Sequence, residues 1–224
     1  PRPAPGLHQE PDRPQMMDFC LIADSPPRRV PGTVYALTDP DYRHMVRFEA
    51  AMLRAKSDQD ARLPIQIALA ALFGSIVQRP PDVKEAFDAL LWFYRGGRPE
   101  QPKDAPPDRA PLAYDYILDG PLIAAAFQQV YNIDLTDPAT RLHWWRFQAL
   151  LQGLPDGCQF TQVVGWRTAD LSGMKGKQLT FYQGMKRRFA LPEDLGKGEK
   201  RVYASKADWD AAFIERLRRQ SGKK

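Results

Sequence analysis

Apolar residues recur at three- and four-residue spacing along most of the chain, and this spacing predicts a protein built mainly of α-helices. The first periodic stretch follows Asp39-Pro40, a capping residue before a proline, and predicts a helix over residues 39–56. Pro64 is expected to open a second helix, which Pro80-Pro81 would end because an interior proline removes a backbone donor.

The middle of the chain continues the same pattern. A third helix is expected to begin at Pro81-Asp82 and to close at Gly96-Gly97. Residues 96–111 are rich in glycine and proline, which is typical of a linker or a long loop. Apolar periodicity resumes over residues 114–132, with a restart at Asp119-Gly120-Pro121.

The densest aromatic stretch runs over residues 137–172. Asp137-Pro138 predicts a helix start, and Gly153 before Pro155-Asp156-Gly157 predicts its stop and a tight turn. Residues 160–171 predict a second, short helix antiparallel to the first. We therefore expect a helical hairpin, whose first helix is apolar nearly all round and lies in the interior.

The two ends differ from this helical middle. Residues 17–22 and 33–37 have the composition of two short strands and predict a small β-hairpin. Towards the other end, residues 175–189 predict a helix and residues 193–200 a polar spacer. Ser205-x-x-Asp208 predicts the cap of a last, basic amphipathic helix.

The prediction for the whole chain is a mostly α fold, a multi-helix bundle with a small N-terminal β-hairpin. Residues 1–16 are proline-rich and poor in large apolar residues, so a flexible arm is expected there. Residues 17–192 are expected to form the helical domain, with a sub-boundary at 96–111, and residues 193–224 a basic extension with one helix.

Charge is unevenly distributed along the chain. The formal net charge is +5, but the residues from Gly173 onward carry 14 Lys/Arg against 6 Asp/Glu, and the preceding ones carry 18 against 21. A basic end suits nucleic acid or an acidic protein face. The sequence has no run of 18 or more apolar residues, and its two cysteines, Cys20 and Cys158, lack a CxxC spacing. We therefore expect no membrane span and a reducing compartment.

The sequence contains no recognisable motif for catalysis or metal binding. His8, His44 and His143 do not cluster, and neither HxxxH nor HExxH occurs. Residues 173–177 lack the spacing of a phosphate loop, and Cys158 has no histidine fixed beside it by sequence. We therefore expect no enzymatic activity, no metal site and no cofactor.

Aromatic residues and arginines lie close together over residues 141–167. Large aromatics at helical spacing are mostly core residues, which is the favoured interpretation. The alternatives are a groove for a protein partner and a platform for stacking nucleic-acid bases. The basic runs 186–188 and 216–219 are typical of solvated faces, with a nucleic-acid contact as the alternative.

Several short motifs occur in a fixed order: Asp41-Tyr42-Arg43, Val46-Arg47-Phe48-Glu49, Ile133-Asp134-Leu135, the run LHWWRFQALLQGL from Leu142 to Leu154, and Arg167-Thr168-Ala169-Asp170-Leu171. In this order they resemble the bacteriophage gene-product-fifteen family of tailed phages and prophages. The resemblance covers residues 17–192, and its LHWW run is a specific motif.

The resemblance implies a helical, non-enzymatic protein of phage tail morphogenesis. Members of that family look like tail-assembly chaperones, which coat the tape-measure protein and recruit tail-tube subunits. The resemblance thus implies these two proteins as partners and the cytoplasm of the bacterial host as the location. It leaves self-association open and implies no membrane contact.

A chaperone of this kind should offer an apolar groove to amphipathic helices of the tape-measure protein. The candidate partner-binding residues are Trp144, Trp145, Phe147, Trp166, Phe127 and Arg146, together with Lys186, Arg187 and Arg188 as a basic end for acidic stretches. The alternative function is a nucleic-acid-binding protein that acts through the basic C-terminal region. It predicts a DNA affinity that falls steeply with salt.

Overall fold

The computed structural model describes residues 26–74, 83–98, 112–193 and 195. Within these ranges the chain forms seven α-helices and no strand, which confirms the predicted mostly α fold. The helices are α1 (Tyr42–Arg54), α2 (Asp58–Phe73), α3 (Val83–Tyr94), α4 (Gly120–Tyr131), α5 (Trp144–Gln152), α6 (Gln159–Thr168) and α7 (Gly176–Arg188). The predicted arm, the 17–22 strand, most of the 96–111 loop and the last helix lie outside the described residues.

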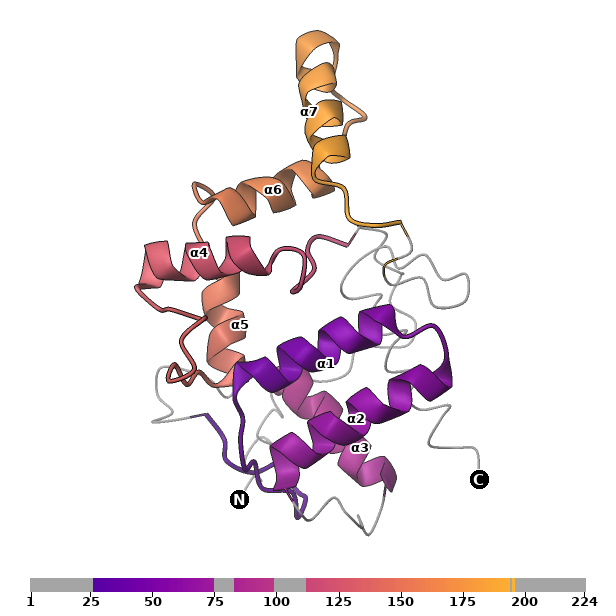
Figure 1. Cartoon of the computed structure of the whole chain (residues 1–224), viewed down its shortest axis with the longest axis vertical. Helices are drawn as coiled ribbons and strands as arrows, with labels where there is room; N and C mark the ends of the chain where they lie inside the picture. Colours follow the sequence, from indigo (N-terminus) through magenta and orange to yellow (C-terminus); the bar gives the residue numbers. More distant parts are fainter. Residues whose placement is uncertain (1–25, 75–82, 99–111, 194, 196–224) are drawn as a thin grey trace, which may run out of the picture.

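The helices pack in two connected groups. In Figure 1, α1 and α2 lie side by side and run antiparallel, and α3 packs against α2. α5 contacts both α1 and α4, so it joins the first group to the second half of the chain. α6 crosses over α4, and α7 contacts α6 and projects away from the other helices (Figure 1). α7 fully buries none of its side chains.

The first two helices begin at other residues than predicted. α1 is capped by Asp41 rather than Asp39, because the Asp41 carboxylate accepts the backbone N–H of Arg43 at 3.0 Å. α2 begins well before Pro64, which lies inside the helix. A reciprocal capping box starts it: the Asp60 N–H donates to the Ser57 hydroxyl at 3.2 Å, and the Ser57 N–H donates to the Asp60 carboxylate at 2.9 Å.

The helix predicted from Asp137 in fact begins at Trp144. Asp137 closes a turn instead, since its carboxylate accepts the N–H of Ala139 at 2.8 Å and its carbonyl accepts the N–H of Thr140 at 3.1 Å. The cap of α5 is His143, whose Nδ1 accepts the N–H of Trp145 at 3.1 Å.

The predicted helical hairpin of α5 and α6 is wrong in its packing. Each of the two helices contacts α4, and they point in different directions in Figure 1. Two side chains of α5 and α6 explain this arrangement. Phe147 of α5 stacks on Phe127 of α4 with ring centroids 5.2 Å apart, and Arg167 of α6 bonds Asp119 at the start of α4. Both helices are therefore drawn to α4 rather than to each other.

The described half of the predicted β-hairpin is a tight turn rather than a strand. Residues 33–37 fold back on residues 28–30, with the Val30 N–H donating to the Tyr35 carbonyl at 2.9 Å. One isolated antiparallel bridge, Arg29 to Ala36, results. Pairing with residues 17–22 stays a prediction, because these lie outside the described ranges.

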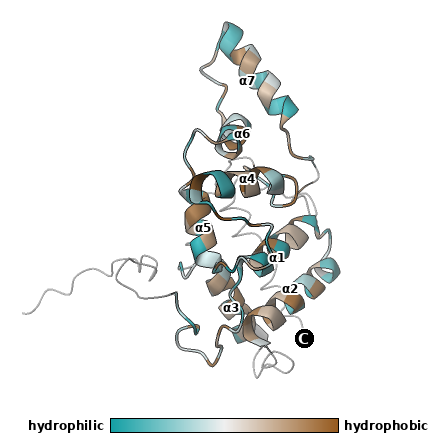
Figure 2. Ribbon diagram, turned by 60° about the vertical axis from the view of Figure 1, so that its left-hand side comes forward, coloured by the Kyte–Doolittle hydropathy of each residue, from teal (hydrophilic) through white to brown (hydrophobic). Residues whose placement is uncertain are grey.

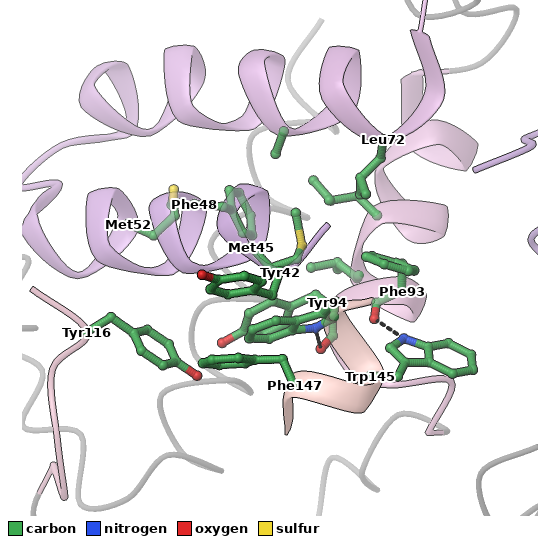
Figure 3. Packing of buried hydrophobic residues seen from close by; sticks show 14 of the residues in the cluster. Tyr42, Met45, Phe48, Met52, Leu72, Phe93, Tyr94, Tyr116, Trp145 and Phe147 are labelled. Atoms are coloured by element: carbon green, nitrogen blue, oxygen red, sulfur yellow. Dashed lines mark hydrogen bonds between the residues drawn. The ribbon is translucent and has the colours of Figure 1, made fainter. Parts of the chain in front are cut away.

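One continuous apolar core connects the helices. Figure 3 shows its centre, where Tyr42 and Phe48 of α1 meet Tyr94 of α3 and Phe147 of α5. Tyr42 stacks on Phe147 at 4.7 Å, and Phe48 meets the Tyr94 ring edge-on at 5.9 Å. The Tyr94 hydroxyl donates to the buried Glu49 carboxylate at 2.7 Å, so this polar pair is satisfied inside the core.

Replacing Gly97 by alanine is expected to lower the free energy of unfolding by about 2–4 kcal/mol. Gly97 has φ +76°, and a Cβ there would lie 2.8 Å from the Trp145 ring, which is only 1% exposed and cannot yield. Urea unfolding measures the loss. Gly32→Ala is the matched control, because Gly32 has φ +70° with nothing within 4 Å of its Cβ position. Equal losses in both variants would contradict the predicted ring contact.

Candidate functional site

The two most distinctive sequence motifs meet in space. Asp41 and His143, the caps of α1 and α5, form an isolated antiparallel bridge. The Tyr42 N–H donates to the Leu142 carbonyl and the Trp144 N–H to the Pro40 carbonyl, both at 2.9 Å. The starts of two helices about a hundred residues apart in the chain are thereby fixed together.

Side chains of α1 also hold the loop that leads into α5. The Arg43 guanidinium donates to the carbonyls of Thr140 at 2.6 Å and of Asp137 at 2.7 Å. The Tyr42 hydroxyl donates to the carbonyl of Leu135 at 2.9 Å. These three contacts fix the loop against the start of α1.

The tryptophan pair closes the end of α3. The indole N–H of Trp144 donates to the Tyr94 carbonyl at 2.8 Å. The indole N–H of Trp145 donates to the Phe93 carbonyl at 2.7 Å (Figure 3). The last carbonyls of a helix lack partners within that helix, and the two indoles supply them. The pair therefore has a packing role and a capping role at once.

Four of the predicted groove residues are core residues. The exposed fractions of Trp144, Trp145, Phe147 and Phe127 are 0%, 1%, 1% and 0%. Their rings stack on one another and on α1 and α3, so no partner can reach them in this structure. These four residues therefore belong to the core. The prediction that they line a groove for a partner is wrong.

Two buried aspartates anchor the region between α1, α4 and α6. The Arg54 guanidinium donates to both oxygens of Asp115 at 3.0 and 2.9 Å, and Arg167 donates to both oxygens of Asp119 at 2.6 and 2.9 Å. Burial alone would raise the pKa of Asp115, but the hydrogen bonds from Arg54 and the Leu118 backbone, with the Arg54 charge, leave it lowered. Arg167 is thus a structural cation, not a base-stacking one.

His143 makes the protein sensitive to acid, since burial lowers its pKa from 6.5 to about 4. A depressed histidine pKa means that the fold favours the neutral ring. This contribution is complete above pH 6.5 and is lost as the pH falls towards 4. We expect the free energy of unfolding to be about 1 kcal/mol lower at pH 5 than at pH 7, after allowance for solvent screening.

Urea unfolding at the two pH values checks this expectation. His143→Asn is the matched variant, because asparagine keeps an N-cap acceptor and does not titrate. Its stability should change less between pH 7 and pH 5 than that of the parent protein. An equal loss in both would assign the acid sensitivity to other groups.

The remaining candidate residues lie on the surface. Arg146 is exposed on α5, whereas Trp166 of α6 is partly exposed where α7 joins it. The Trp166 ring stacks on Phe189 at 5.2 Å and meets Phe181 edge-on at 6.5 Å. Lys186, Arg187 and Arg188 occupy the last turn of α7. The structure thus brings Trp166 near the basic run and leaves Arg146 on another helix.

Phe181 is the surface residue that the sequence analysis missed. Its side chain is 50% exposed although it is a large aromatic. Phe181, Met185 and Phe189 follow one another at four-residue spacing, which places them on one face of α7. This four-residue spacing is the sequence pattern that could have predicted an apolar face on α7.

Comparison with known families shows to which family the chain belongs. A family model described as Bacteriophage Gp15 protein matches residues 29–191. The chain belongs to this family. Neither the search of curated proteins nor that of solved structures finds a match. Membership of the Gp15 family supports a phage structural or assembly-related protein.

The Gp15-family motifs of this chain stabilise the fold, because most of their side chains form contacts between helices. The Asp41-Tyr42-Arg43 motif and the start of the LHWW run form the bridge and the loop contacts between α1 and α5. Arg167, from the last of the five motifs, forms the buried ion pair with Asp119 at the start of α4. A surface for partners must therefore be sought outside these buried side chains.

The described residues can also be assessed for a metal site and for a membrane-spanning helix. They contain no group of three or more His, Cys, Asp or Glu side chains that could hold a metal ion. None of their helices combines the length and the apolar character needed to cross a membrane. Cys158 is buried at the start of α6, where its sulfur lies 3.3 Å from the Thr161 hydroxyl.

Proposed function

We propose that this Gp15-family protein is a tail-assembly chaperone that binds the phage tape-measure protein and helps recruit tail-tube subunits, without catalysing a reaction. The observation that carries the proposal is the family match over residues 29–191. The partners come from the resemblance of the sequence motifs to proteins of tail morphogenesis. The proposed place of action is the cytoplasm of the bacterial host.

The distribution of side chains supports a binding role. A chaperone must keep its own fold while it offers apolar surface to another chain. Here the aromatic core is closed and hydrogen-bonded, while α7 leaves apolar side chains accessible outside that core. A long helical partner offers amphipathic segments that such a surface could cover until assembly buries them.

Co-expression with the tape-measure protein of the same phage tests the proposal. We expect the tape-measure protein to be soluble and to copurify with this chain, and to be insoluble when expressed alone. As a control, Trp144→Ala, which is expected to destabilise the fold by about 3–5 kcal/mol, should keep less of it soluble. A tape-measure protein that stays insoluble with the folded chain would refute the proposal.

The alternative is nucleic-acid binding through the basic C-terminal region, favoured by the run Lys186-Arg187-Arg188 in the last turn of α7. Such binding depends on phosphate contacts, so log affinity should fall linearly with log salt. Titration of a duplex DNA at about 50 and 200 mM salt measures the slope, since six to ten contacts change the affinity by about 10³–10⁵. A shallow slope would exclude this alternative.

A further inference from the structure

α7 carries an apolar face that the rest of the described structure leaves incompletely covered. Phe181, Met185 and Phe189 lie along this face, and Tyr182 lies beside it. Trp166 of α6 packs against the two phenylalanines, yet Phe181 remains 50% exposed and the other side chains are only partly buried. Large accessible aromatics gathered on one helix mark a protein contact.

The charges of α7 frame this apolar face. The helix contains Lys177 near its start and Lys186, Arg187 and Arg188 at its end, and no Asp or Glu. Figure 2 shows the same arrangement: both ends of α7 are hydrophilic, with hydrophobic positions between them. An apolar centre with a charged rim is the usual anatomy of a protein interface.

The base of the helix is fixed, so the face is presented in one orientation. Arg167 donates to the Phe189 carbonyl and to the buried Asp119 carboxylate. Arg188 lies over the Phe189 ring, 5.5 Å from its centroid. α7 is therefore anchored at its C-terminal end and projects beyond α6 at its N-terminal end (Figure 1).

Charge decides which occupant fits. A second copy that packed α7 against α7 would bring four cations of one helix against four of the other, which is repulsive. Nucleic acid would satisfy the cations and would leave the aliphatic and aromatic face without apolar partners. A helix with apolar residues on one face and acidic residues beside them satisfies both features.

We propose that the apolar face of α7, with Trp166, docks an acidic amphipathic helix of a protein partner. Phe181 and Met185 fill the apolar seam, and Lys186 and Arg188, on either side of it, pair with carboxylates of the partner. That the tape-measure protein supplies this helix rests on the proposed function; the docking surface itself rests on the residues of α6 and α7.

A synthetic helical peptide tests the surface without any phage partner. The probe carries leucines at heptad a and d positions with glutamates beside them, and its counterpart has lysine for every glutamate. Fluorescence anisotropy with the full chain measures both affinities. We expect the acidic peptide to bind at least about tenfold more tightly than the basic one. Equal binding, or no binding of the acidic peptide, would overturn the proposal.

Two variants of α7 locate the binding. Phe181→Ser and the triple change Lys186→Glu, Arg187→Glu, Arg188→Glu should each weaken the acidic peptide about tenfold or more. Both should keep a cooperative melting transition close to that of the parent, because α7 fully buries none of its side chains. The matched controls are Ile67→Ser, which removes a 57% exposed apolar side chain from α2, and the triple reversal of the exposed Arg47, Arg62 and Arg98. Controls that weaken binding as much would place the contact elsewhere and overturn the proposal.

Pull-down of the co-expressed tape-measure protein separates this inference from the proposed function. Retention by the parent chain and loss with Phe181→Ser supports both. Equal retention by both chains leaves the proposed function standing and overturns the α7 surface as its site. Peptide binding without retention of the tape-measure protein supports the docking surface and refutes the proposed partner.

Competition with single-stranded DNA tests the nucleic-acid alternative at the same surface. A single-stranded DNA that displaces the peptide completely, and whose own binding is unaffected by Phe181→Ser, would overturn the protein-docking proposal in favour of nucleic acid.

Discussion

Arg167→Met is expected to lower the free energy of unfolding by about 3–5 kcal/mol, because it leaves a buried carboxylate without its cation. The side chains of Arg167 and Asp119 are only 9% and 3% exposed, and the guanidinium grips both carboxylate oxygens. The total free energy of unfolding of a small domain is about 5–15 kcal/mol, so this loss would be a large part of it. Urea unfolding followed by far-UV circular dichroism measures it.

A second substitution, at Asp119, shows whether the destabilisation by Arg167→Met comes from an unpaired buried charge or from lost packing. The double variant Arg167→Met, Asp119→Leu should recover part of the loss, since no buried charge then remains unpaired, although the Asp115 N–H loses its acceptor. Arg146→Met is the control for removing an arginine, because Arg146 is exposed, and it should stay within about 0.5 kcal/mol of the parent. A double variant no more stable than Arg167→Met would contradict the explanation.

Trp144→Ala is expected to lower the free energy of unfolding by about 3–5 kcal/mol. The indole is fully buried, stacks on Tyr94 and Phe147, and donates its N–H to the Tyr94 carbonyl at 2.8 Å. The truncation leaves a cavity at the junction of α3 and α5. Thermal and urea unfolding, with a cooperative transition in each, give the change.

Two variants calibrate that result. Trp144→Phe keeps most of the ring packing and removes the indole donor, so it should cost about 1–3 kcal/mol. Phe181→Ala removes an aromatic that is 50% exposed and should cost much less than Trp144→Ala. If Phe181→Ala destabilised the protein as strongly as Trp144→Ala, α7 would belong to the core and not to a binding surface.

Helical periodicity predicted the helices because most of them bury one face, but it did not locate every start. For α2 the decisive signal was present locally, since Ser57-x-x-Asp60 is a capping box, and the proline rule was given precedence over it. For α5 the decisive contact is not local. Arg43, 94 residues away in the sequence, donates a hydrogen bond to the Asp137 carbonyl. The residues around Asp137 give no sign of this contact.

The site was harder to predict than the fold for a related reason. Trp144 and Trp166 look alike in the sequence, since each lies within two residues of an arginine in an aromatic helix. Trp144 is buried where α5 packs against the end of α3 and donates its N–H to the Tyr94 carbonyl, whereas Trp166 lies near the end of α6 and packs against Phe181 and Phe189. Burial was thus decided by tertiary contacts. The basic run at 186–188 was identifiable because charge is a property of the sequence itself.

Light scattering of the complex after size exclusion tests the central claim most directly. The tape-measure protein is long, so a chaperone that coats it should bind in many copies along its length. The account predicts a soluble complex whose mass corresponds to several copies of this chain on one tape-measure protein, and no such complex with Phe181→Ser. A tape-measure protein that elutes without this chain would contradict the account.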